Sequence, residues 1–151
     1  MITRQMLGAA AAVAALLAAC GDNQDDSGAR ELLSRVRADQ YRTWDRAPGW
    51  ETRRDSSAPH SEQVDIYVND RVAEVLALAE PLEGWPEDSI IVKDGFDGSD
   101  LEIIAIMEKR SSGWFWAEYD SEGDPDYSGQ PAICIDCHQS GSDDVRAFRL
   151  P

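Results

Sequence analysis

Residues 101–119 read LEIIAIMEKRSSGWFWAEY, and the class of the fold follows from how this stretch pairs. Leu101 to Lys109 is rich in β-branched and apolar residues, which predicts a strand, and the aromatic run from Gly113 to Tyr119 predicts a second one. The residues Ser111-Ser112-Gly113 between them are typical of a hairpin with a short loop. The stretch therefore predicts two neighbouring antiparallel strands.

Two more strands are predicted upstream of this hairpin. Val64–Val68 is β-branched and aromatic and is followed by an Asn-Asp pair typical of a turn or helix cap, and Ser89–Lys93 is another β-branched run. Between them, Arg71–Glu80 carries apolar residues at helical spacing and stops at Pro81. The apolar face of this predicted helix consists of Val72, Val75, Leu76 and Ala79.

An N-terminal helix and several loops complete the predicted domain. Ala29 to about Trp44 has its apolar residues near one helical face, whereas residues 45–62 and 120–132 hold prolines, glycines and charges and are expected to be irregular. Residues 143–148 are expected to form a last helical turn. This order of elements predicts an α+β fold: a mainly antiparallel β-sheet with an N-terminal helix and a C-terminal Cys-x-x-Cys-His segment.

The N-terminus has the pattern of an export signal. Arg4 precedes an uncharged run from Met6 to Ala19, which is too short for a comfortable transmembrane helix. Leu17-Ala18-Ala19-Cys20 resembles the lipobox of bacterial lipoproteins, in which the chain is cut before Cys and the thiol is acylated; an ordinary secretory signal is the alternative. We therefore expect residues 1–19 to be a lipoprotein signal peptide and Cys20 to carry lipid on the periplasmic side of a bacterial membrane.

The remaining chain is expected to be a polar tether and one domain. Residues 20–28 contain the lipidated Cys and a run without large apolar groups, and residues 29–151 suffice for one compact domain. The net charge of −15 repels nucleic acid and anionic lipid, so neither is an expected partner. The acidic residues are scattered, which favours a solvated surface over a dedicated docking site.

The chemistry is predicted by Cys134-Ile135-Asp136-Cys137-His138. Cys-x-x-Cys-His is the attachment motif of c-type haem. Two thiols three residues apart on a helical turn can reach the two vinyl groups of one porphyrin, and the adjacent imidazole can then bind the iron. We therefore expect one covalent haem c held by Cys134 and Cys137, with His138 as the proximal iron ligand.

Two other kinds of site can contain a Cys-x-x-Cys pair. A redox disulfide of the Cys-x-x-Cys type opens a helix after a strand in a thioredoxin-like unit, and that unit is not predicted here. Half of a zinc site would need a second cysteine pair, whereas the chain has three cysteines in all and His60 as its one other histidine.

The sixth iron ligand is left open by the sequence. Met107 lies on the inward side of a predicted strand and is more typical of core packing, and His60 lies in a loop where a structural hydrogen bond is the commoner role. Either residue could close the iron of an electron-transfer cytochrome. Lys93 shares a strand face with Ile91, and from spacing alone it is a strand-end lysine that reaches solvent.

From about Trp44 to Phe148 the chain resembles the P-460-type cytochromes and the related β-sheet cytochromes c′ (cytochromes c′-beta). The matching pieces, in order, are Ala58-Pro59-His60, 64–70 (VDIYVND), 85–94 (WPEDSIIVKD), 106–109 (IMEK), 114–119 (WFWAEY) and 134–138 (CIDCH). Two departures are Ser61, where relatives often have Gly, and Asp94, where Glu is common.

The resemblance implies a mostly antiparallel β fold, a homodimer and one five-coordinate c-type haem. In P-460-type enzymes a lysine is also cross-linked to the porphyrin, and the matching position is Lys93. Those enzymes oxidise hydroxylamine with nitric oxide chemistry and pass electrons to a redox partner protein, whereas the β-sheet cytochromes c′ bind small gases without turnover. Phe96, Trp114, Phe115 and Trp116 are candidates for the walls of the haem pocket, although ordinary core packing is the commoner role for each of them. A distal carboxylate is sought among Glu122, Asp124 and Asp126, any of which could instead be a solvated surface acid.

Overall fold

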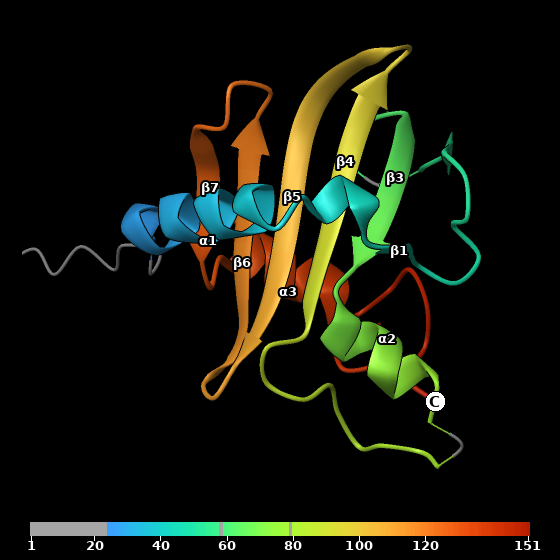
Figure 1. Cartoon of the computed structure of the whole chain (residues 1–151). Helices are drawn as coiled ribbons and strands as arrows, with labels where there is room; N and C mark the ends of the chain where they lie inside the picture. Colours follow the sequence, from blue (N-terminus) through green and yellow to red (C-terminus); the bar gives the residue numbers. More distant parts are fainter. Residues whose placement is uncertain (1–23, 58, 79) are drawn as a thin grey trace, which may run out of the picture.

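The computed structural model describes residues 24–57, 59–78 and 80–151, so the signal segment and Cys20 lie outside the described residues. Within them the fold is α+β, as predicted, with one seven-stranded antiparallel sheet in the order β1-β3-β4-β5-β6-β7 and with β2 also pairing with β3 (Figure 1). The elements are α1 (Asp26–Ala38), η1 (Tyr41–Thr43), β1 (Asp45–Arg46), β2 (Arg54–Asp55), β3 (Gln63–Val68), α2 (Asp70–Leu76), β4 (Ile90–Asp97), β5 (Asp100–Arg110), β6 (Gly113–Asp120), β7 (Pro125–Gly129) and α3 (Ala132–His138).

The predicted hairpin is the centre of this sheet. β5 and β6 pair from Ile103↔Asp120 to Arg110↔Gly113, and the turn closes at Gly113, whose φ of +111° suits a residue without a Cβ. The long β5 also pairs with β4 over its whole length. These two pairings join β4, β5 and β6 into the rigid platform on which the site is built.

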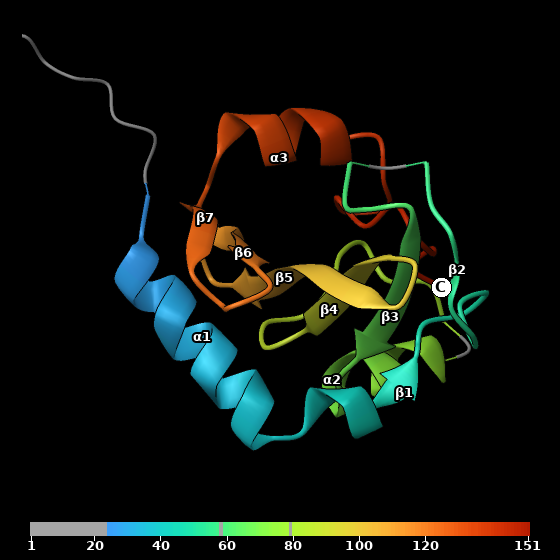
Figure 2. The ribbon, with the colours of Figure 1, turned by 90° about the horizontal axis from the view of Figure 1, so that it is seen from above.

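The two faces of the sheet are covered by different elements. α1 buries Ala29, Leu32, Leu33 and Val36 against one face, and its N-terminus is capped by Asp25, whose carboxylate accepts a 2.8 Å hydrogen bond from the amide of Gly28. α2, α3 and the C-terminal segment cover the other face. Seen from above, α1 and α3 lie on opposite sides of the sheet (Figure 2).

Three boundaries differ from the predicted ones. The first helix ends at Ala38 rather than near Trp44, because Gln40 takes a left-handed conformation (φ +52°) that an α-helix cannot continue through. Residues 120–132 are not all loop: β7 forms there by pairing with β6, and its proline stands at the first position of the strand, where a missing N–H is tolerated. Residues 143–148 form no helical turn.

Smaller differences concern α2 and β4. α2 ends at Leu76, and Ala79, expected on its apolar face, lies outside the described residues. β4 continues past Lys93 to Asp97, because Asp94 is satisfied inside the protein by the Tyr41 hydroxyl (2.8 Å) and the Arg42 guanidinium (2.7 Å). No helix in the described ranges is long and apolar enough to cross a membrane.

Candidate functional site

A cavity of about 500 Å³ lies between the sheet face opposite α1, the helix α3 and the loop before β3. It brings together residues that are far apart in the chain: His60, Lys93, Met107, Cys134, Cys137 and His138 all line it. Every residue that the sequence singled out as a haem or iron ligand therefore lines one cavity.

The sheet supplies the floor of the cavity as two cross-strand rows. Ile66, Lys93, Ala105 and Glu118 are successive partners across β3, β4, β5 and β6, and the row beside it includes Ile91, Met107 and Trp116. Because side chains alternate along a strand, both rows point to the same face. The small side chain of Ala105 separates Lys93 from Glu118, so a cation and a carboxylate flank a gap in an otherwise apolar floor.

The two motif cysteines are carried by α3. This helix starts after Pro131, whose carbonyl accepts hydrogen bonds from the amides of Cys134 (3.1 Å) and Ile135 (3.2 Å). Both thiols are free; Cys134 is half-buried and Cys137 is exposed. Burial raises the pKa of the Cys134 thiol to about 11, so it is neutral at physiological pH.

His138 is held in the orientation of a metal ligand. Its Nδ1 lies 2.9 Å from the carbonyl oxygen of Asp144, and because a carbonyl can only accept, Nδ1 carries the hydrogen. In the neutral ring the lone pair then belongs to Nε2. Burial lowers the pKa of His138 to about 4, although the hydrogen bond to Asp144 acts in the opposite direction, so the ring is neutral at pH 7. Trp116 packs edge-on against it, with 4.6 Å between ring centroids.

The loop that supplies the Asp144 carbonyl is fixed by Asp143. The Asp143 carboxylate accepts hydrogen bonds from the amide of Trp85 (2.7 Å) and from the ammonium of Lys109 (2.8 Å), and its carbonyl accepts from the indole of Trp114 (2.8 Å). Sequence reasoning missed this residue. The run Gly141-Ser142-Asp143-Asp144 is a turn signal that could have suggested a structured loop in place of the expected helical turn.

Lys93 does not reach solvent in the way that its spacing suggested. It lines the cavity and is only partly exposed, since β4 continues beyond it. Burial, with a smaller contribution from the nearby charge of Arg146, lowers the pKa of Lys93 to about 8. At pH 7 the amine is therefore still mostly protonated, and only about a tenth of it is neutral and able to act as a nucleophile or ligand.

His60 is paired with a carboxylate that the sequence did not single out. Its Nδ1 lies 2.6 Å from Oε2 of Glu118, and the two side chains are only 15% and 18% exposed. The ring centroid of His60 is 6.3 Å from that of His138. Glu118 lies on the inward face of a strand that is rich in aromatic residues. A charged residue at such a position was the feature of the sequence that could have identified it.

The loop carrying His60 is seated against the sheet. A Cβ on Gly95 would lie 2.5 Å from the His60 carbonyl oxygen, so this close approach requires glycine. Ser61 has φ +75°, a left-handed conformation in which glycine would be less strained. Its hydroxyl donates to Glu102 across the loop (3.0 Å).

Several expected pocket residues lie elsewhere. Of the four aromatic candidates, Trp116 lines the cavity, whereas Phe115 packs on the face beneath α1, Phe96 lies under the Arg53 guanidinium (3.3 Å), and Trp114 packs in the core beside the cavity. Side chains alternate along β6, so Phe115 points to the opposite face of the sheet from Trp114 and Trp116.

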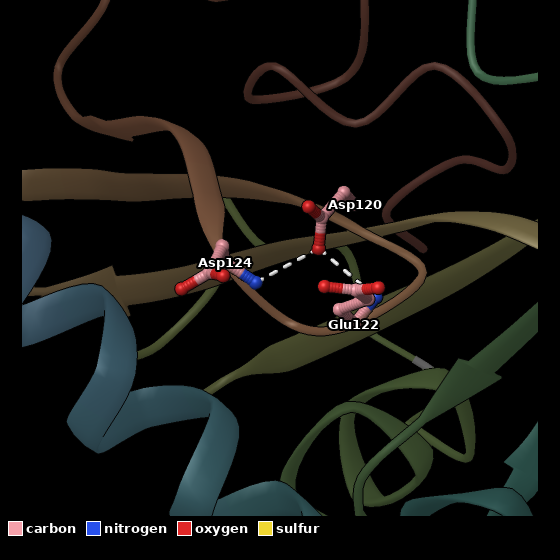
Figure 3. Close-up of side chains that lie close together, drawn as sticks. All are labelled: Asp120, Glu122 and Asp124. Carbon is pink, nitrogen blue, oxygen red and sulfur yellow. Dashed lines mark hydrogen bonds between the residues drawn. The ribbon is translucent and has the colours of Figure 1, made fainter.

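The acidic loop after β6 is not part of this site. Glu122, Asp124 and Asp126 do not line the cavity. The Asp120 carboxylate accepts hydrogen bonds from the amides of Glu122 (2.9 Å), Gly123 (2.8 Å) and Asp124 (2.9 Å), which closes the turn. Figure 3 shows the bonds from Glu122 and Asp124. These bonds lower the pKa of Asp120. The nearby carboxylates of Glu122 and Asp124 are exposed, as is common without a metal, so we read the cluster as a structural turn.

Comparison with known proteins gives no match: no family model, no curated protein and no solved structure is significantly similar to the chain.

Proposed function

We propose that this protein is an exported, lipid-anchored c-type haem protein that binds or oxidises small nitrogen compounds such as nitric oxide or hydroxylamine. The observation that carries the proposal is the hydrogen bond from His138 to Asp144, because it aligns a neutral imidazole beside two free thiols in Cys-x-x-Cys-His order.

The residues around the cavity fit a haem. The volume of the cavity is within the range of cofactor sites, and the floor of the cavity is mainly apolar. Both thiols and His138 line the cavity from one side. Cys134 and Cys137 would form thioethers with the two vinyl groups, and His138 Nε2 would bind the iron. When bound, the haem supplies an iron centre that takes up diatomic and small nitrogen ligands and exchanges electrons.

Lys93 is proposed as an additional covalent link to the porphyrin, as the resemblance implies. Its lowered pKa supports the idea, because a neutral amine has the lone pair that a new N–C bond requires. Replacing a meso C–H by a C–N bond releases two protons and two electrons, so the step needs a two-electron oxidant of the peroxide class. Without this cross-link, Lys93 would remain an amine at the edge of the site.

The setting of the molecule belongs to the same proposal. Lipid on Cys20 would hold the domain at the periplasmic side of a membrane, with residues 21–28 as the spacer. A redox partner protein would remove electrons if the site oxidises its ligand, and the protein would form a homodimer. The other candidate functions are an electron-transfer cytochrome with a six-coordinate haem and a gas-binding protein without turnover.

The proposal is tested on the purified full-length protein. We expect a haem stain at the protein's mass on a denaturing gel, and an optical change on titration of the reduced protein with nitric oxide that saturates at one equivalent. Cys134→Ala/Cys137→Ala is the matched control and should lose the stain. A wild-type protein without the stain would show that no haem is covalently bound. A stained protein whose spectrum changes with neither nitric oxide nor hydroxylamine would leave electron transfer as the function.

A further inference from the structure

Two imidazoles line the cavity, and they come from two different elements of the fold. His138 ends α3, whereas His60 belongs to the loop before β3 that rests on Gly95. Their ring centroids lie 6.3 Å apart with the planes inclined at 63°. The sequence contains two histidines, and the fold brings both of them to this cavity.

Both rings are fixed by the same kind of hydrogen bond. His138 donates from Nδ1 to the Asp144 carbonyl (2.9 Å), and His60 offers Nδ1 to the Glu118 carboxylate (2.6 Å), which as an ionised group can only accept. In each neutral ring the lone pair is then on Nε2. A carbonyl or carboxylate on the second nitrogen is the usual support of a histidine that binds a metal.

The separation of the rings fits one metal ion between them. A metal–imidazole bond of about 2.0 Å places the ring centroid roughly 3 Å from the metal, so two rings on opposite sides of one ion are separated by roughly 6 Å. This agrees with the distance between His60 and His138.

We infer that His60, supported by Glu118, is the second axial ligand of the iron, and that a small ligand enters the site by displacing it. The inference rests on the proposed haem and departs from the five-coordinate iron that the resemblance implies. It makes His60 the residue that sets how readily nitric oxide or hydroxylamine gains access, and Glu118 a positioning residue that strengthens the bond by holding the His60 ring.

The other two candidates for this position are less well placed. Met107 is 9% exposed and packs in the apolar cluster beneath the cavity with Trp114 and Trp116, as a core side chain does. Lys93 neighbours the cationic Arg146, and it would have to lose its proton before it could bind a metal. His60 lines the cavity with Nδ1 already paired to Glu118, so Nε2 is the nitrogen left for a metal.

The test uses the purified holoprotein and four variants. We expect the wild-type ferric protein to be low-spin, with the near-infrared magnetic circular dichroism of two imidazole ligands. His60→Ala should be high-spin and return to low-spin on addition of imidazole, whereas the control Met107→Leu should keep the wild-type spectrum. Glu118→Gln should remain low-spin but release His60 at an at least about tenfold lower cyanide concentration, in line with the effect of removing a hydrogen-bond partner from a metal ligand. Glu102→Gln, which touches the same loop through Ser61, should not change that concentration.

Each contrary result is specific. A high-spin wild type, a histidine–methionine or histidine–lysine spectrum, or a low-spin His60→Ala protein would overturn the inference even where the haem stain is present. If His60→Ala does not fold, the wild-type spectrum and the Glu118→Gln displacement decide the matter. Absence of the haem stain in the wild type would instead refute the proposed function, so the two failures are distinguishable.

Discussion

The Nδ1 of His138 lies 2.9 Å from the carbonyl oxygen of Asp144, six residues further along the chain. The chain can fold back in this way because Asp143 and Asp144 both adopt positive φ (+47° and +65°) and Gly141 approaches Val145 more closely than any side chain would allow. The orientation of His138 therefore depends on a loop that contributes no ligand of its own.

Loss of the Asp143 carboxylate should loosen this loop. Asp143→Ala leaves the partly buried Lys109 ammonium and the Trp85 amide without their acceptor, and we expect the free energy of unfolding to fall by about 2–3 kcal/mol. Denaturant unfolding measures this loss. Asp136→Ala removes an exposed acid from α3 and should change stability by less than about 0.5 kcal/mol; equal effects of the two changes would contradict the role of Asp143.

Single variants should distinguish the covalent attachment of the haem from the ligation of its iron. Cys137→Ala leaves one thioether and should weaken the haem stain on a denaturing gel, whereas His138→Ala keeps both thiols and should retain the stain with a changed iron spectrum. A His138→Ala protein with the unchanged wild-type optical and spin state would show that His138 is not the iron ligand.

Lys93 should control the porphyrin spectrum if it is cross-linked. A porphyrin substituted at a meso carbon loses symmetry, so wild-type absorption should lie to the red of an ordinary c-type haem, and Lys93→Ala should restore the ordinary spectrum with the haem still attached. Proteolysis of the wild type should yield one haem peptide containing both the Lys93 and the Cys134–Cys137 segments. Identical spectra of wild type and Lys93→Ala would remove the cross-link.

The same residue predicts a pH dependence of stability in the haem-free chain. Burial lowers the pKa of Lys93 from its ordinary value of 10.5 to about 8, so between these values the unfolded chain binds more protons than the folded one. The free energy of unfolding should therefore rise as the pH increases from about 8 to 10.5, with the full penalty present below pH 8. Lys93→Met should be more stable by about 1–3 kcal/mol at pH 7. Parallel wild-type and Lys93→Met curves across this window would show that the amine is solvated.

The anchor is tested by fractionation of cells. Cys20→Ala should move the protein from the membrane to the soluble fraction, because acyl chains on this thiol would supply the membrane affinity. Mass spectrometry of the wild-type N-terminus should find an acylated Cys20. A wild-type protein that is soluble in the periplasm with an unmodified N-terminus would show that the signal is an ordinary secretory one.

The sequence alone determined the class of the fold and the chemistry-bearing motif. Runs of β-branched, apolar and aromatic residues joined by a short Ser-Ser-Gly turn identified β5 and β6, and helical spacing identified α1 and α2, because these signals are local in the chain. It did not reveal β7, since Pro125, Gly129 and the acids around them are typical of a loop until a neighbouring strand supplies their hydrogen bonds. In the same way, Gln40 ends α1 through a backbone angle that composition does not encode.

Only the tertiary structure decided what surrounds the Cys-x-x-Cys-His segment. Pairing across three strands sets Lys93 and Glu118 on either side of Ala105. The close approach of the loop to Gly95 places the ring centroid of His60 6.3 Å from that of His138. His60 and Glu118 are 58 residues apart in the chain, and each alone is an ordinary polar residue. Their common position depends on strand register and loop seating, which arise from long-range packing rather than from any local pattern.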